Sequence, residues 1–219
     1  MIRVGLVDDH KLFRKSLANL IGSFEGLDVV LEASNGKELF KELPNIELDI
    51  VLLDIQMPEM DGYETCEILN KDYPEIKILI VSQLTSNESV NKTIELGAHG
   101  YFTKNSDPEQ LEIAIKNTFN LGFYFGTDLS SLLKDAVLYK KMYTIPMSNQ
   151  LISFTTREIE IIKMAGKEFN SIEIAKKLNI NTRTVETHRK RIMEKVGSKN
   201  FIGVILYALK HEFISINHF

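Results

Sequence analysis

Short apolar runs alternate with amphipathic segments along the first 121 residues of the chain. Residues 2 to 7, 50 to 53 and 78 to 82 are rich in Val, Ile and Leu, which is typical of strands covered on both faces, and residues 27 to 31 and 100 to 102 are shorter candidates. Helical spacing marks five segments between and after these strands: 11 to 23, 36 to 43, 63 to 72, 86 to 96 and 107 to 119. Because parallel neighbours need crossover connections, this alternation predicts an α/β fold with a doubly wound, five-stranded parallel sheet.

The pattern becomes purely helical towards the C-terminus. Four segments follow helical spacing there: 156 to 167, 171 to 178, 182 to 196 and 200 to 212. Only residues 179 to 181 separate the second and third of these helices, which is the connection length of a helix-turn-helix motif. The second half of the chain is therefore expected to form a small all-α domain.

Capping residues mark where these C-terminal helices begin. Thr155 with Glu158 three residues later forms a capping-box pattern, Asn170 or Ser171 can cap the next helix, and Asn181 the third. Between the two halves, residues 128 to 143 carry apolar positions at helical spacing and predict a linker helix. Its apolar stripe is either a packing face or a solvated spacer.

Charge divides the chain in the same place as the hydrophobic pattern. The whole chain of 219 residues has a net charge of −4. Residues 1 to 121 hold 11 basic and 21 acidic residues and carry −10, residues 122 to 150 carry +1, and residues 151 to 219, with 12 basic and 7 acidic residues, carry +5. We therefore expect an acidic domain that can hold a cation, a linker, and a basic domain that can meet phosphates, with those three boundaries.

Several classes of protein are disfavoured by composition. No apolar run approaches the roughly 18 to 20 residues that span a bilayer, and acidic residues stand where a secretory signal would be apolar, so we expect a cytoplasmic protein without a membrane partner. Cys66 is the single cysteine, which excludes an intrachain disulfide and a thiolate zinc site.

Three aspartates fall at strand ends in the acidic domain. Asp8 and Asp9 follow the first strand, and Asp54 follows the strand at 50 to 53. The carboxyl ends of parallel strands lie on one edge of a sheet, where such carboxylates converge and an all-oxygen site suits Mg²⁺. Each aspartate taken alone is more simply a solvated loop residue. Three aspartates together at one edge of the sheet favour the metal site.

Two further polar residues belong to the same edge. Ser82 ends the fourth strand and Lys104 follows the fifth. A hydroxyl and an ammonium facing carboxylates and a metal form a receptacle for a phosphoryl group. The alternatives are a strand-end cap for Ser82 and a surface lysine for Lys104.

Residues 1 to about 121 resemble the flavodoxin-like receiver domain of two-component response regulators. The resemblance rests on markers in order: Asp8-Asp9, Asp54 with Met57-Pro58 and Asp61-Gly62, Ser82, and Gly97-Ala98 through Tyr101 to Lys104. It implies that Asp54 accepts a phosphoryl group from a histidine kinase. It further implies the roles of neighbouring groups: direct Mg²⁺ ligation by Asp9, Asp54 and the Gln56 backbone carbonyl, action of Asp8 through water, phosphate pairing by Lys104, and switching by Ser82 and Tyr101. Tyr101 could equally be a core aromatic.

The helix expected at 182 to 196 has a polar, mostly basic face. Val185, His188, Ile192 and Val196 are spaced towards a core. The outward positions are then Thr182, Arg183, Glu186, Thr187, Arg189 and Lys190. Such a face suits the major groove of double-stranded DNA, although for an isolated helix a solvated surface is the usual interpretation.

Residues 154 to 200 resemble the LuxR-type helix-turn-helix of the NarL/FixJ subfamily of response regulators. Framework positions from Glu158 to Lys195 match, and the resemblance places base-reading positions on Glu186, Thr187 and Lys190. Many members have a lysine where Glu186 stands, so the operator sequence cannot be transferred. The last helix resembles the element through which such domains pair on DNA, or it simply closes the bundle.

Together the two resemblances imply a transcription regulator that dimerises when a sensor histidine kinase phosphorylates Asp54. Such a protein is not an enzyme beyond its own phosphotransfer and autodephosphorylation. One alternative is an aspartate-nucleophile phosphotransferase or phosphatase for small substrates, which usually has a second carboxylate where Gln56 stands. Another is a DNA-binding protein whose receiver is only a dimerisation scaffold.

Overall fold

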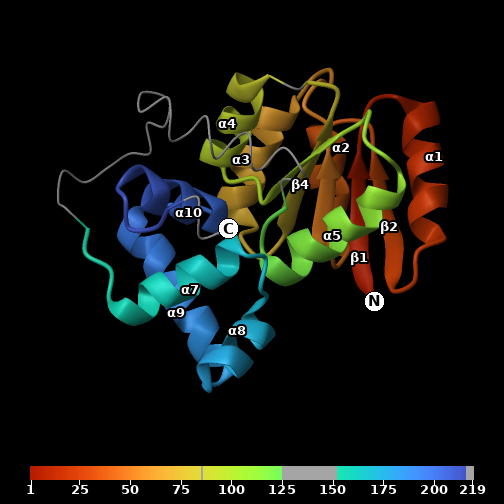
Figure 1. Ribbon diagram of the computed structural model, residues 1–219. Coiled ribbons are helices and arrows are strands. Elements are labelled where there is room, and N and C mark those ends of the chain that lie inside the picture. Colours follow the sequence, from red (N-terminus) through yellow and green to blue (C-terminus); the bar gives the residue numbers. More distant parts are fainter. Residues whose placement is uncertain (85, 125–151, 216–219) are drawn as a thin grey trace. The chain divides into compact units, whose positions relative to one another are not determined.

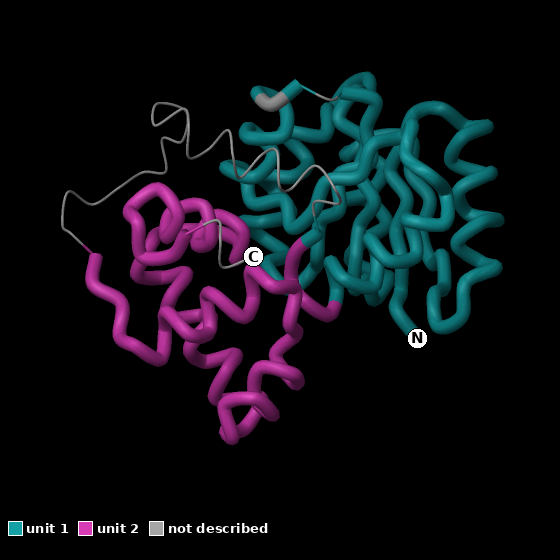
Figure 2. The backbone as a smooth tube through the Cα atoms, viewed as in Figure 1, with its two compact units in different colours: residues 1–119, 124–126 teal, residues 120–123, 127–219 magenta. Residues whose placement is uncertain are grey.

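The computed structural model describes residues 1–84, 86–124 and 152–215 (Figure 1). The chain divides into two compact units (Figure 2). The first contains a five-stranded sheet and helices α1 to α5, and the second contains helices α7 to α10. The linker helix expected at 128 to 143 lies outside the described residues.

The sheet of the first unit is entirely parallel, with strand order β2-β1-β3-β4-β5. Its strands are β1 (Ile2–Val7), β2 (Leu27–Ala33), β3 (Ile50–Leu53), β4 (Lys77–Ser82) and β5 (Gly100–Thr103). The predicted five-stranded parallel sheet is confirmed, and each predicted strand is found within two residues of its expected ends.

Helices connect and flank these strands. They are α1 (Lys11–Gly22), α2 (Gly36–Glu42), the short 3-10 helix η1 (Leu43–Asn45), α3 (Gly62–Asp72), α4 (Asn87–Leu96) and α5 (Glu109–Leu121). The chain moves from β1 outwards to β2 and then back across β1 to β3, β4 and β5. Because crossovers are right-handed, α1 lies on one face of the sheet and α2, α3 and α4 lie on the other.

The core of the first unit occupies both faces of the sheet. On one face, β1, β3 and β4 pack against α1 and α5 through a cluster of buried apolar side chains that includes Leu6, Ile50 and Ile115. The opposite face of the sheet is buried as well, since Leu53 and Ile80 are 0% exposed. Each such side chain contributes about 1.5 to 3 kcal/mol of burial free energy, which holds the strand ends in fixed positions.

The second unit consists of α7 (Thr156–Gly166), α8 (Ser171–Leu178), α9 (Thr182–Val196) and α10 (Phe201–Lys210). The capping box of Thr155 with Glu158 is confirmed, as is the cap of α9 by Asn181. Asn170, not Ser171, caps α8, and it forms a second capping box with Glu173. Asn179 ends α8 in the left-handed conformation (φ 51°), which turns the chain sharply towards α9.

Candidate functional site

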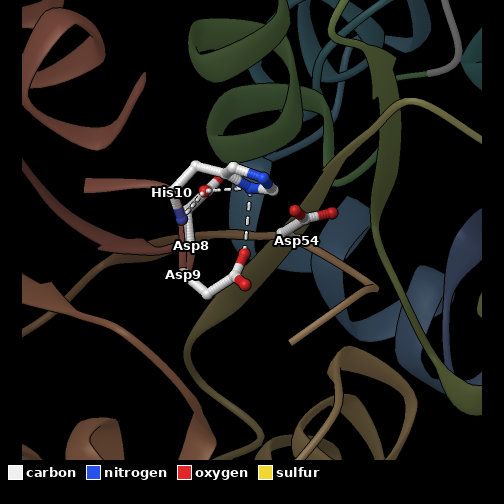
Figure 3. A group of neighbouring side chains, drawn as sticks. All are labelled: Asp8, Asp9, His10 and Asp54. Carbon is white, nitrogen blue, oxygen red and sulfur yellow. Dashed lines mark hydrogen bonds and ion pairs between the residues drawn. The ribbon is translucent and has the colours of Figure 1, made fainter. Parts of the chain in front are cut away.

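The aspartates expected to converge lie at the topological switch point of the sheet. The chain leaves β1 for β2 on one side and returns to β3 on the other, and in parallel sheets the carboxyl ends of two such strands are the usual place of a binding site. Asp8 and Asp9 follow β1, and Asp54 follows β3 (Figure 3). Ligand atoms of these three residues and of His10 all lie within 4.8 Å of one another. The side chains of Asp8 and Asp54 are almost completely buried.

Lys104 neutralises part of this negative charge. Its Nζ lies 2.7 Å from Asp8 Oδ2 and 2.5 Å from Asp54 Oδ2. Burial acts to lower the pKa of Lys104, but hydrogen bonds to Asp54 and Asp8 outweigh it and hold the pKa above its ordinary value. The ammonium is therefore charged at neutral pH and faces the carboxylates, where it can also pair with an incoming phosphoryl group.

The two oxygens of Asp54 have different partners. Oδ1 accepts hydrogen bonds from the main-chain amides of Ile55 (2.7 Å) and Gln56 (3.4 Å), whereas Oδ2 accepts from Lys104. The loop after Asp54 is held by the start of α3, because the Gly62 amide donates to the Ile55 carbonyl (2.9 Å). A Cβ on Gly62 would lie 2.1 Å from the Asp54 carbonyl oxygen, so only glycine allows α3 to begin this close to the carboxylate.

The donor set of the cluster fits a hard divalent cation. Asp9 Oδ1 is buried, and among the described residues its polar contact is with the imidazole of His10, whose Nδ1 lies 3.0 Å away. It belongs to a group of carboxylate oxygens crowded within one coordination sphere, and such oxygens repel each other unless a cation lies between them. The side chain of Gln56 is exposed, and its main-chain amide donates to Asp54 Oδ1 (3.4 Å), so the backbone of this residue lies beside the Asp54 carboxylate.

Ser82 and Tyr101 both contact the loop that follows β4. Ser82 is fully buried, and its hydroxyl accepts a hydrogen bond from the Leu84 amide (3.3 Å). The Tyr101 hydroxyl donates to the Leu84 carbonyl, and burial raises the pKa of Tyr101 to about 12, so the phenol stays protonated. A change in the partner of Ser82 would therefore be transmitted to the loop residue that holds Tyr101.

Two residues near the cluster are absent from the sequence prediction. Arg14 of α1 donates to the Asp8 carbonyl and thereby fixes the loop that carries the aspartates. His10 turns back towards Asp9, with its Nδ1 3.0 Å from Asp9 Oδ1. The sequence could have indicated this contact of His10, because the residue directly follows Asp8-Asp9. Arg14 has no such signal, because its contact depends on how α1 packs on the sheet.

Helix α9 presents most of the predicted polar face. Arg183, Glu186, Thr187 and Lys190 are exposed and Thr182 is half-buried, while Val185 faces the core as expected. The hydroxyl of Thr187 donates back to the Arg183 carbonyl (2.8 Å).

Arg189 differs from its predicted outward orientation. Its guanidinium lies 4.3 Å from the centroid of the Phe201 ring and donates to the Ser171 hydroxyl (3.4 Å), so it packs against α10 and α8. The long aliphatic stem of arginine allows the charged group to fold back over an aromatic ring.

Comparisons with known proteins agree with both halves of this architecture. Residues 4–116 match the model of the response regulator receiver domain, and residues 152–208 match that of bacterial regulatory proteins of the luxR family. The chain is a response regulator of the NarL/FixJ type. It therefore combines a receiver with a LuxR-type DNA-binding domain and acts as a transcription regulator.

Curated relatives match this response regulator over nearly its full length. The transcriptional regulatory protein LnrK of Bacillus subtilis is 30% identical over 215 residues, which cover 96% of this chain and 98% of LnrK. The response regulator protein VraR of Staphylococcus saprophyticus is 28% identical, with 97% of this chain and 99% of VraR covered.

Solved structures share the fold. A LuxR-family two-component response regulator from Aurantimonas sp. is 30% identical with a TM-score of 0.57, and the match covers 61% of this chain and 95% of that one. RcsB of Salmonella enterica serovar Typhimurium, solved on a promoter with a phosphomimetic, is 22% identical with a TM-score of 0.56 and covers 96% and 100% of the two chains. Within the described ranges, no helix of the response regulator is long and apolar enough to cross a membrane.

Proposed function

We propose that Asp54 is the phosphoryl acceptor of this response regulator and that its phosphorylation controls dimerisation and sequence-specific DNA binding. The observation that carries the proposal is the geometry around Asp54: a buried carboxylate with one oxygen held by main-chain amides, the other by Lys104, and two further carboxylates beside it. We propose boundaries of 1 to 121 for the receiver, 122 to 150 for the linker and 151 to 219 for the DNA-binding domain.

The phosphoryl donor is the phosphohistidine of a sensor histidine kinase. An Asp54 oxygen attacks phosphorus, the bond between phosphorus and the histidine nitrogen breaks, and the nitrogen keeps the electron pair. Asp9, Asp54 and the Gln56 backbone carbonyl would hold Mg²⁺ directly and Asp8 through water, and the ion would offset charge on the transferring oxygens. Lys104 is placed to leave its carboxylate partners and pair with the new phosphate.

Phosphorylation then changes the hydrogen bonds at the carboxyl edge of the sheet. Ser82 gives up its bond with the Leu84 amide and donates to a phosphoryl oxygen, and Tyr101 follows the displaced loop. Water later hydrolyses the acyl phosphate and regenerates Asp54. Both reactions take place on the protein's own residue, so it is a regulator that catalyses only its own phosphotransfer and dephosphorylation. Because the proposed target is double-stranded DNA, we assign the protein to the bacterial cytoplasm.

The deciding experiment is phosphorylation of the purified protein by a small phosphodonor. With Mg²⁺, we expect intact-mass spectrometry to record the gain of one phosphoryl group and light scattering to record dimers. Chelation of Mg²⁺ is the matched control and should prevent the gain. If neither a small donor nor a phosphorylated kinase adds the group, the receiver is a scaffold and the proposal is wrong. If the group is added but dimers do not form, dimerisation is not the output.

The exposed face of α9 is the proposed contact with double-stranded DNA. Thr182, Arg183, Glu186, Thr187 and Lys190 face away from the helical core, whereas the packing of Arg189 against Phe201 takes it out of this set. A symmetric dimer would read two half-sites roughly one helical turn apart.

Replacement of Lys190 tests this interface. Lys190→Ala removes an exposed ammonium from α9, so affinity should fall, and the slope of log affinity against log salt should decrease by about 1 if Lys190 meets a phosphate. Lys163→Ala, on α7 outside the helix-turn-helix pair, is the matched control. Fluorescence anisotropy over a range of salt concentrations measures both. If the two variants have equal slopes of log affinity against log salt, Lys190 does not contact a DNA phosphate.

A further inference from the structure

His10 belongs to the acidic cluster in space as well as in sequence. It follows Asp9, occupies the N-cap position of α1 without a side-chain capping bond, and directs its imidazole back towards the carboxylates (Figure 3). Nδ1 lies 3.0 Å from Asp9 Oδ1 and 3.7 Å from Asp8 Oδ1. We propose that His10 is a metal-selectivity residue, whose Nδ1 serves as a nitrogen ligand and favours first-row transition-metal dications over Mg²⁺. This inference rests on the proposed function, in which the cluster holds a divalent ion.

The backbone of His10 is fixed at both ends. Its amide donates to Asp8 Oδ1 (2.9 Å), and its carbonyl accepts the first hydrogen bond of α1 from the Arg14 amide (2.9 Å). The position of the imidazole therefore depends only on its two side-chain torsions. The His10 side chain is 70% exposed, so an ion can approach it from solvent. The buried carboxylate of Asp8 lies on the protein side of the ring, with Oδ1 3.7 Å from Nδ1.

The spacing of the donor atoms fits two neighbouring ligands of one ion. Ligands at right angles around an ion with bonds of about 2.1 Å are about 3.0 Å apart. The separation between His10 Nδ1 and Asp9 Oδ1 equals this edge. Asp9 Oδ1 is buried, and within the described part of the chain its polar contact is with His10, so an ion placed between the two atoms would be a ligand contact for both.

The chemistry of the donors gives the direction of the selectivity. Mg²⁺ prefers oxygen ligands, whereas imidazole suits first-row transition-metal dications such as Co²⁺, Ni²⁺ and Zn²⁺. A site of carboxylates alone discriminates weakly between these ions. A nitrogen donor strengthens binding of the transition metals and leaves Mg²⁺ almost unaffected.

Calorimetric titration of the tag-free full chain with MgCl₂ and with CoCl₂ tests the inference. In His10→Asn, we expect Co²⁺ affinity to fall on the order of tenfold and Mg²⁺ affinity to change by less than about threefold. The visible absorption of bound Co²⁺ should also shift, because a nitrogen ligand is lost. His211→Asn, which replaces an exposed histidine of the second unit, is the matched control for Co²⁺ bound outside the cluster.

The outcomes separate this inference from the proposed function. If His10→Asn leaves the ratio of the two affinities and the Co²⁺ spectrum unchanged while the Asp54 site still binds Mg²⁺, the role assigned to His10 is wrong and the acceptor site stands. Asp9→Asn should weaken the binding of both Mg²⁺ and Co²⁺. If the wild-type chain binds neither ion, the metal site itself is refuted, and with it both proposals.

Discussion

Replacing Asp54 with asparagine is expected to abolish phosphorylation, so that no mass gain is detected from any donor. The amide nitrogen and oxygen of asparagine are far poorer nucleophiles than a carboxylate, and Asp8 keeps its contact with Lys104. Intact-mass spectrometry of the variant beside the wild-type protein, with the same donor and Mg²⁺, measures the effect.

This loss should not come from unfolding. Asp54→Asn takes one negative charge out of a buried cluster in which three carboxylates face a single ammonium, so repulsion in the folded state decreases. We expect a thermal midpoint at or above that of the wild-type protein. Asp61→Asn is the matched control: Asp61 caps α3 through a bond to the Glu64 amide (2.9 Å), and asparagine caps equally well. A mass gain in Asp54→Asn would show that another residue accepts the phosphoryl group.

Replacing Glu158 with alanine is expected to destabilise the DNA-binding domain. Glu158 is 4% exposed, and its carboxylate accepts hydrogen bonds from Lys195 Nζ (2.7 Å) and the Thr155 amide (2.8 Å) and completes the capping box of α7. The variant loses the cap and the tie from α7 to α9. Because Lys195 remains partly solvated, we expect a loss of about 2 kcal/mol in the free energy of unfolding.

The pH dependence of this contribution has a definite sign. Burial acts to raise the pKa of Glu158, but hydrogen bonds from Lys195 and Thr155 outweigh it and hold the pKa below its ordinary value. The carboxylate therefore stabilises the fold above its unfolded-state pKa of about 4.3, and the contribution disappears as pH falls through the lower folded-state pKa. The difference in free energy of unfolding between the wild-type protein and Glu158→Gln should therefore become smaller as the pH falls.

Denaturant unfolding of the two proteins from neutral to acidic pH measures this difference. Glu160→Ala is the matched control on the same helix, since Glu160 pairs with Arg157 at the surface (3.0 Å) and its loss should change stability by less than about 0.5 kcal/mol. Similar losses in Glu158→Ala and Glu160→Ala would show that the ion pair with Lys195 does not hold α7 to α9.

Much of the receiver follows from the order of residues alone. Apolar runs at 2 to 7, 50 to 53 and 78 to 82 are typical of strands covered on both faces, and the helical segments between them favour parallel crossovers. Parallel strands bring their carboxyl ends to one edge, so the approach of Asp8 and Asp9 to Asp54 follows without knowledge of side-chain positions. The helix starts at Thr155 and Asn181 are equally local, because a cap bonds only to its own first turn.

The partners of individual side chains were decided by tertiary packing. Sequence placed Lys104 at the sheet edge, but its simultaneous contact with Asp8 and Asp54 depends on the spacing of three strand ends. The helical period predicted that Arg189 faces outward, yet the ring of Phe201, from a different helix, draws its guanidinium inward. Periodicity fixes the direction of Cβ, whereas a long, flexible side chain ends where neighbouring elements offer it contacts. His10 shows the same limit: its adjacency to Asp9 is sequence, but the 3.0 Å separation of their donor atoms exists only in the folded chain.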